Sequence, residues 1–139
     1  MRCYTYFIKL HADKLIMKGK VLIYDDDADI LEVCSAILRI QGHEVDVRDN
    51  CRTLLEDIET YKPEVIMMDN WLPDIGGVKA IQLIKEQEKF VTTPVIFFSA
   101  NSHVEELAKE AGADFVLKKP FDMAALQKIV VQALQKSRA

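Results

Sequence analysis

Charged and hydroxyl side chains stand directly after four apolar runs of this chain. Asp25 and Asp26 follow the run KVLIY, and Asp69 follows VIMM. Ser99 follows VIFF, and Lys119 follows FVLK. Short continuous apolar runs are typical of buried parallel strands, and the carboxyl ends of such strands lie at one edge of a sheet. These side chains are therefore expected to meet in one crevice.

The expected crevice is crowded with negative charge. Two unit charges about 5 Å apart repel by roughly 3 kcal/mol at an effective dielectric constant near 20, so Asp25, Asp26 and Asp69 require a positive partner. Carboxylate oxygens are ligands that Mg²⁺ prefers, and Mg²⁺ also binds phosphate oxygens. Lys119 offers a second positive charge, and the Ser99 hydroxyl can donate a hydrogen bond to a bound anion. The pattern thus indicates chemistry on a phosphate group beside a magnesium ion.

Each of these residues also has a simpler interpretation. Acidic residues after a strand often cap the following helix or lie in its first turn, which we expect of Asp27 and Asp29. Alone, Ser99 is typical of a turn, and Lys119 is typical of a solvated surface. Four strand ends that carry acid, acid, hydroxyl and amine in this order favour one shared functional site over four unrelated residues.

Strand-like and helix-like segments alternate from residue 17 onward. This alternation predicts a parallel sheet covered by helices on both faces. The expected fold is an α/β, flavodoxin-like, doubly wound five-stranded parallel sheet with strand order 2-1-3-4-5. Ligands of such sheets bind where the strand order reverses, here between the first and third strands. The expected strands are residues 20–24, 43–47, 65–68, 95–98 and 115–117.

The helices are predicted from apolar side chains at helical spacing. Ser102 and Glu105 match the capping-box pattern and are expected to open a short helix that Gly112 ends. The stretch PDIGG, residues 73–77, is expected to be rich in turns, and Asp74, Gly76 and Gly77 are interpreted as turn chemistry only. Asp122 is expected to cap the last helix, whose apolar stripe is Leu126, Ile129, Val130, Ala133 and Leu134.

The composition is that of a globular protein. The 139 residues are 50% hydrophobic and 29% charged, and this length suits about one domain. A formal net charge of −4 provides no basic field, so nucleic acid is not expected as a direct partner. No apolar run approaches the ~18 residues of a membrane span, so we expect no membrane insertion and a cytoplasmic location.

Cysteine and histidine give no sign of a disulfide framework or a zinc site. The three cysteines are odd in number and include no CxxC pair. Cys34 lies in an apolar helical pattern and is expected in the core. His11, His43 and His103 have no metal-ligand spacing and are interpreted as incidental.

The strand-end segments resemble the receiver domains of two-component response regulators. The resemblance covers about residues 18–136 and rests on VLIYDDDADIL, PEVIMMDNWLPDIGG, PVIFFSA and GADFVLKKPFD. It implies that Asp69 is the phosphoacceptor, that Ser99 is the hydroxyl residue of the family, and that Lys119 contacts the phosphoryl group. The implied Mg²⁺ ligands are Asp25, Asp26, Asp69 and the backbone carbonyl of Trp71.

The resemblance further implies signalling rather than catalysis on a separate substrate. A sensor histidine kinase or a histidine phosphotransfer protein would transfer a phosphoryl group from a phosphohistidine to Asp69. The chain would take part only in its own magnesium-dependent phosphorylation and dephosphorylation. Output would pass through a downstream protein target, and a phosphorylation-dependent dimer is compatible with this role. The Lys119–Pro120 bond is cis in such domains.

The resemblance gives no role to the side chains of two residues near the site, Val116 and Trp71. Receiver domains usually carry Tyr or Phe three residues before the lysine, where this chain has Val116. Phe115 should point to the opposite face of its strand. We therefore expect output through loop and helix movement rather than through an aromatic swing. Trp71 is either an exposed loop aromatic or a partial shield of the acyl phosphate against water.

Two other functions remain open from the residues alone. A metal-dependent phosphohydrolase of the haloacid dehalogenase type also begins with an apolar strand and Asp-x-Asp, as at Asp25 and Asp27. Ala28 and Asp29 do not continue its pattern. A phosphorylation-independent interaction module would not need the complete acidic, hydroxyl and lysine set. An EF-hand is excluded because Ile30 replaces the required glycine.

Residues 1–16 precede the resemblance and form an N-terminal extension whose role the sequence leaves open. The extension fits both strand alternation and helical spacing. Met17 and the following Lys-Gly-Lys would be a normal receiver start. We therefore expect the receiver domain at residues 17–139.

Overall fold

The computed structural model describes residues 17–139. The expected extension at residues 1–16 lies outside the described residues, so its role and the domain boundary at residue 17 stay predictions. Within the described part, none of the helices combines the length and the apolar character that a membrane crossing requires.

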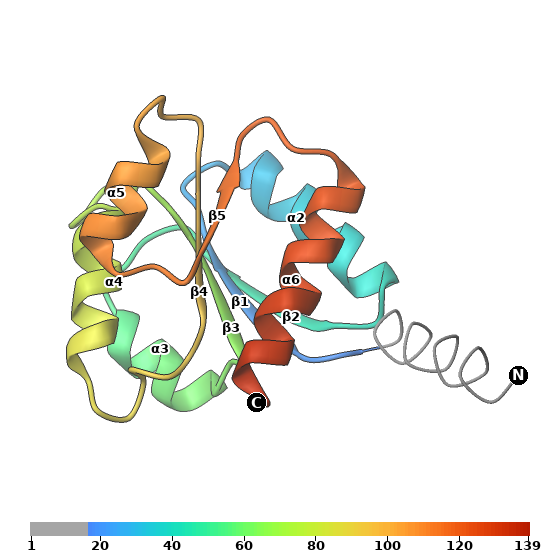
Figure 1. The fold of residues 1–139 in the computed structure, drawn as a ribbon, viewed down its shortest axis with the longest axis horizontal. Helices are drawn as coiled ribbons and strands as arrows, with labels where there is room; N and C mark the ends of the chain where they lie inside the picture. The colour runs from blue at the N-terminus through green and yellow to red at the C-terminus, as the bar shows by residue number, and fades with distance from the viewer. Residues whose placement is uncertain (1–16) are drawn as a thin grey trace, which may run out of the picture.

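Five parallel strands form one sheet in the order β2-β1-β3-β4-β5, which confirms the predicted topology. A helix follows each strand, and the sheet runs through the centre of Figure 1. The strands are β1 (Lys20–Tyr24), β2 (Glu44–Arg48), β3 (Val65–Asp69), β4 (Val95–Ser99) and β5 (Phe115–Lys118). The helices are α2 (Ala28–Ile40), α3 (Leu54–Tyr61), α4 (Gly77–Glu86), α5 (Val104–Ala111) and α6 (Met123–Ser137).

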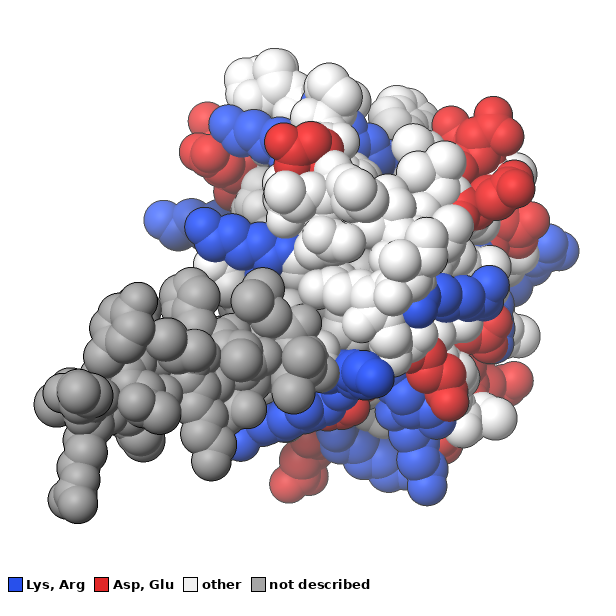
Figure 2. All heavy atoms as spheres, turned by 90° about the vertical axis from the view of Figure 1, so that its right-hand side faces the viewer, with Lys and Arg blue, Asp and Glu red and all other residues white. Residues whose placement is uncertain are grey.

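Helices cover both faces of the sheet, so the core has two layers. Helices α2 and α6 lie on one face, and α3, α4 and α5 lie on the other (Figure 1). Because side chains alternate along a strand, Met67 and Phe98 pack in the α2–α6 layer, whereas Met68 and Phe97 pack in the α3–α5 layer. Figure 2 views the molecule from the α2–α6 side, where charged groups of both signs border a central uncharged area.

The central strands are buried on both faces, which explains their continuous apolar sequence. Every residue of β3 and β4 is buried, including Asp69 and Ser99 at their ends. The edge strands are more open, with exposed Glu44 in β2 and exposed Lys118 in β5. Polar side chains at the ends of β3 and β4 are therefore exceptions in an apolar sheet.

Two of the expected helix caps are confirmed. The Asp27 side chain accepts hydrogen bonds from the backbone N–H groups of Asp29 and Ile30, at 2.9 and 3.3 Å. The Asp122 side chain accepts one from the backbone N–H of Ala125 at 2.7 Å. Both caps satisfy first-turn N–H groups that have no partner within the helix.

The expected capping box of Ser102 and Glu105 is wrong. Helix α5 begins at Val104, and its N-cap residue His103 makes no side-chain cap. The Asn101 side chain instead accepts a hydrogen bond from the His103 backbone N–H at 2.8 Å. This Asn-centred turn places Ser102 one residue before the capping position.

The interpretation of His43 as incidental is also wrong. His43 is buried and stands just before β2, and its Nδ1 accepts a hydrogen bond from the Gly19 backbone N–H at 3.1 Å. Burial lowers the pKa of His43 below its ordinary value, and nearby Arg138 lowers it further. His43 is thus a neutral structural residue that joins the starts of the first two strands.

Asp114 joins four elements at the amino end of the sheet. Its carboxylate accepts hydrogen bonds from Nζ of Lys85 and Lys136 at 2.8 and 2.7 Å, and from the Val95 backbone N–H at 2.8 Å. Burial acts to raise the pKa of this carboxyl, but the hydrogen bonds from both lysines outweigh burial and lower the pKa below its ordinary value. One side chain thereby ties α4, β4, β5 and α6 together.

Removing this charge should destabilise the fold. We expect Asp114→Asn to lower the free energy of unfolding near neutral pH by about 2 kcal/mol, because two charge-assisted hydrogen bonds are weakened. A carboxyl with a lowered folded-state pKa stabilises the fold above its unfolded pKa, and this contribution disappears as the pH falls through the folded value. The difference between wild type and variant should therefore close in acid, as measured by urea unfolding across pH.

The control for this prediction is an exposed aspartate. Asp49→Asn should change the free energy of unfolding by less than about 0.5 kcal/mol. A difference between wild type and Asp114→Asn that persisted unchanged into strong acid would contradict the assigned role.

Candidate functional site

The expected site residues lie together at the carboxyl edge of the sheet. Asp69 is the last residue of β3 and Ser99 is the last residue of β4, whereas Asp25 and Lys119 directly follow β1 and β5. The strand register brings these ends side by side. The topology thus places them around the point where the strand order reverses.

Strand alternation sorts the site residues onto two faces. Ile23 and Met67 pack in the α2–α6 layer, so Asp25 and Asp69, each two residues further on, belong to that face. Phe97 packs in the α3–α5 layer, so Ser99 belongs to the opposite face. The two acids and the hydroxyl therefore reach the carboxyl edge of the sheet from opposite faces.

Lys119 is the cation between the two acids. Its Nζ donates hydrogen bonds to Asp25 Oδ2 at 2.7 Å and to Asp69 Oδ1 at 2.9 Å. Asp25 is 1% exposed and Asp69 is 5% exposed, so water reaches neither carboxylate freely. Buried carboxylates are strongly unfavourable without a cation, and Lys119 is what allows these two to lie together.

Burial and charge act in opposite directions on the pKa values of this cluster. Burial raises the pKa of Asp69 above its ordinary value; the hydrogen bond from Lys119 opposes the rise, and the Asp25 carboxylate adds to it. Burial acts to lower the pKa of Lys119, but its hydrogen bonds to Asp25 and Asp69 outweigh burial and raise the pKa. The lysine therefore keeps its charge at neutral pH.

The third acid, Asp26, completes a cluster of oxygen donors. Asp26 is exposed, and one carboxylate oxygen from each of Asp25, Asp26 and Asp69 lies within 4.8 Å of the others. Hard cations with oxygen ligands fit such a donor set, and the exposed side leaves room for water ligands. This cluster is therefore able to hold a metal ion.

Ser99 and Trp71 lie at the margin of the cluster. Ser99 is buried, and its Oγ accepts a hydrogen bond from the Asn101 backbone N–H at 3.1 Å. Trp71 donates its backbone N–H to Asp69 Oδ2 at 3.0 Å, while its indole is 76% exposed. The exposure of the indole is compatible with both interpretations of Trp71, and the metal-ligand role of its carbonyl stays a prediction.

The expectation that Phe115 and Val116 point to opposite faces is confirmed. Phe115 packs in the α2–α6 layer and Val116 in the α3–α5 layer. On the Ser99 side, β5 thus contributes an aliphatic side chain. The Lys119–Pro120 bond is cis, as the resemblance implies.

Two side-chain contacts beside the site were not predicted from the sequence. Tyr24, buried at the end of β1, donates its hydroxyl to Asp57 Oδ2 at 3.0 Å. Asp74 Oδ2 accepts a hydrogen bond from the Cys51 backbone N–H at 3.1 Å and joins the loops after β2 and β3. The turn expected here is present at residues 73–75, and Asp74 adds a contact between two loops that the sequence did not predict. The Tyr24 contact could have been predicted, because a tyrosine at the end of an aliphatic run often needs a partner for its hydroxyl. The Asp74 contact could not, because aspartate is common in turns of every kind.

Gly77 packs the start of α4 against the main chain of Asp69. A Cβ at residue 77 would lie 2.0 Å from the Asp69 carbonyl oxygen. The Gly77 N–H donates a hydrogen bond to the Asn70 carbonyl at 2.9 Å, which fixes this close approach. A side chain at this position would displace the residue that carries the central carboxylate.

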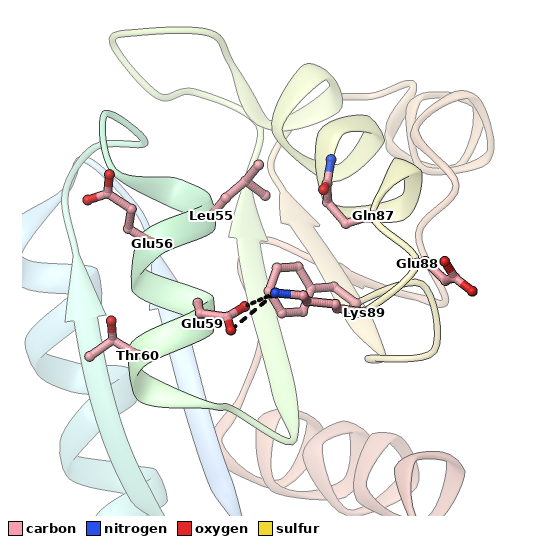
Figure 3. A pocket seen from close by; sticks show the side chains of 8 residues that line it. Leu55, Glu56, Glu59, Thr60, Gln87, Glu88 and Lys89 are labelled. Carbon is pink, nitrogen blue, oxygen red and sulfur yellow. Dashed lines mark hydrogen bonds and ion pairs between the residues drawn. The ribbon is translucent and has the colours of Figure 1, made fainter.

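A separate surface cavity of about 750 Å³ lies between α3 and the segment after α4 (Figure 3). Lys89 and Glu59 form an ion pair across it at 3.3 Å. The cavity shares no residue with the acidic cluster. The cavity is therefore separate from the acidic cluster at the edge of the sheet.

Together, the fold and the cluster define a doubly wound α/β domain with an acidic site at the carboxyl edge of its sheet. Residues 21–131 match the family model described as response regulator receiver domain. The chain therefore belongs to this family and is a receiver domain of two-component response regulators. The match favours this function over the phosphohydrolase and the interaction module.

Similar proteins support the family assignment. The regulatory protein AtoC of Escherichia coli K12 is 36% identical over 120 residues, covering 84% of this chain and 25% of AtoC. The transcriptional regulatory protein PrrA of Mycobacterium leprae is 33% identical over 116 residues, covering 82% of this chain and 49% of PrrA. The chain thus spans half or less of the length of these relatives.

Solved structures support the fold. The chemotaxis response regulator CheY4 of Vibrio cholerae matches with a TM-score of 0.78 and 27% identity, over 85% of this chain and 100% of that chain. A putative response regulator from Chloroflexus aurantiacus matches with a TM-score of 0.81 and 26% identity, over 86% and 99% of the two chains. The sheet order and helix placement are thus those of single receiver domains.

Adding a methyl group to Gly77 should disturb the site from behind. We expect Gly77→Ala to lower the free energy of unfolding by about 1–3 kcal/mol, because the new Cβ overlaps the Asp69 carbonyl oxygen. Chemical denaturation measures this change. Lys79→Ala in the same helix is the exposed control and should stay within about 0.5 kcal/mol of wild type. Equal stability of Gly77→Ala and wild type would refute the close approach.

Proposed function

We propose that Asp69 accepts a phosphoryl group and that a partner protein recognises the phosphorylated state. The observation that carries the proposal is the buried Asp69 carboxylate, which lies 2.9 Å from Lys119 Nζ and beside two further acids. Groups of like charge, gathered with a cation and with shifted pKa values, are typical of functional sites.

Asp69 is the nucleophile of the proposed reaction. One carboxylate oxygen forms a bond to phosphorus while the bond between phosphorus and the donor breaks, and the electron pair of that bond leaves with the donor. Lys119 offsets charge on the phosphoryl oxygens. The Ser99 hydroxyl donates a hydrogen bond to one of these oxygens. The acyl phosphate stays on the chain until water hydrolyses it, so no separate substrate is turned over.

The acidic cluster supports Mg²⁺ as the resident metal ion. Asp25, Asp26 and Asp69 would hold it, with the backbone carbonyl of Trp71 as a further ligand. Their oxygen-only donor set suits magnesium better than softer metals. When bound, the ion offsets the negative charge of the acids and of an incoming phosphoryl group.

The proposed donor is a phosphohistidine on a sensor histidine kinase or a histidine phosphotransfer protein. Output passes through contacts with a downstream protein. Some relatives are named as DNA-binding regulators, such as NtrC of Proteus hauseri, 25% of which aligns with this chain. For this chain, a net charge of −4 supports protein contacts over direct nucleic-acid contacts. The cytoplasmic location and the phosphorylation-dependent dimer stay predictions.

Small phosphodonors test the proposed function directly. With Mg²⁺ and acetyl phosphate, the wild-type chain should gain one phosphoryl group, and Asp69→Asn should gain none, as measured by intact mass. Chelation of Mg²⁺ should prevent the modification. Asp29→Asn removes an exposed acid from the first turn of α2 and should be phosphorylated like wild type.

Two outcomes would contradict this proposal. Multiple-turnover release of phosphate from many esters would support the phosphohydrolase. Absence of any modification, together with unchanged partner binding, would support the phosphorylation-independent module.

The exposed indole of Trp71 should slow loss of the phosphoryl group. Its backbone nitrogen lies 3.0 Å from Asp69 Oδ2 and its indole is exposed, so in this role the ring would stand beside the path of attacking water. We expect Trp71→Ala to accelerate dephosphorylation by roughly two- to tenfold, and Trp71→Phe to have a smaller effect, because an aromatic ring excludes water. The decay of phosphorylated protein after donor removal measures both rates. An unchanged rate in Trp71→Ala would defeat the shielding role.

A further inference from the structure

The ring of Phe98 lies against the ammonium group of Lys119. The Lys119 Nζ is 4.6 Å from the ring centroid, within the roughly 6 Å range of cation–π attraction. Phe98 is fully buried, and its ring meets Phe121 edge to face, with centroids 6.4 Å apart and planes at 61°. The ring is therefore held by packing on the same face of the sheet as Asp25 and Asp69.

The ring differs from the two carboxylate partners of Lys119 in one respect. In the proposed reaction Asp69 becomes an acyl phosphate and loses its carboxylate charge, and Asp25 is a proposed metal ligand. The ring attracts the cation through its quadrupole and carries no net charge. It therefore remains the same partner through the whole phosphorylation cycle, and it adds no repulsion toward an incoming phosphoryl group.

We propose that Phe98 is a positioning residue that holds the Lys119 ammonium beside Asp69, ready for the phosphoryl group. The inference rests on the proposed function, because Lys119 acts on the phosphoryl group there. Phe98 contributes no charge of its own, and its role is to position the charge of Lys119. An aliphatic side chain of similar size would fill the same space without attracting the cation.

Phe97 offers a matched control. It is the preceding residue of β4, it is fully buried as well, and it points into the α3–α5 layer away from Lys119. In the full chain with Mg²⁺ and acetyl phosphate, Phe98→Leu should lower the phosphorylation rate constant about three- to thirtyfold. Phe97→Leu should leave it close to wild type, with circular dichroism reporting the folding of both variants.

A fluorination series separates cation attraction from packing. Mono-, di- and trifluorophenylalanine at position 98 keep nearly the same shape while progressively weakening the negative face of the ring. The phosphorylation rate constant should fall stepwise along this series, whereas the same series at position 97 should be flat. These near-isosteric variants keep the test decisive even where Phe98→Leu fails to fold.

The outcomes distinguish this role from the proposed function. A phosphorylated wild type with no trend along the series at position 98 overturns the role of Phe98 alone. Equal effects at positions 97 and 98 reduce it to core packing and also overturn it. A wild type that gains no phosphoryl group at Asp69 overturns the proposed function and the role together.

Discussion

The site depends on one partly buried cation, Lys119. Lys119 lies between Asp25 and Asp69, at 2.7 and 2.9 Å, and joins the segment after β5 to the ends of β1 and β3. Removing one partner from such an arrangement leaves an uncompensated charge in the core. The ion pairs therefore require β1, β3 and β5 to end at one edge, as the parallel strands of this sheet do.

The surrounding structure holds the main chain on which the carboxylates stand. Gly77 lets α4 begin against the Asp69 carbonyl, and Asp74 joins the loop after β3 to Cys51 in the loop after β2. Tyr24 anchors the end of β1 to Asp57 in α3. None of these residues contributes a charge to the cluster itself. They limit how far the like charges can move apart, which keeps an unfavourable arrangement assembled.

The sequence predicts the sheet and the cluster well because both rest on local patterns. Buried parallel strands are continuous apolar runs, and a polar residue that ends such a run stands out. Contacts between distant segments are harder to predict from the sequence. At Asp74, for example, a common turn residue accepts a hydrogen bond from a backbone N–H 23 positions away. The capping box of Ser102 failed for a different reason, because Asn101 offered a competing turn. Phe98 looked like any core residue, although alternation from Phe98 and Lys119 on neighbouring strands could have placed them on one face.

The same alternation divides the site into two halves with different chemistry. The α2–α6 side carries Asp69, Lys119 and the Phe98 ring, whereas the α3–α5 side carries Ser99 and the aliphatic Val116. In the proposed reaction the charge change would arise on one face, and the hydroxyl that binds the phosphoryl group approaches from the other. Lys118 stands opposite Ser99 in the sheet and pairs with Glu105 of α5 at 3.1 Å. Because that pair is exposed and weak, we expect a shift of the β4 and β5 ends to reach α5 mainly through the main chain. This route needs no aromatic at position 116, which is consistent with the valine found there.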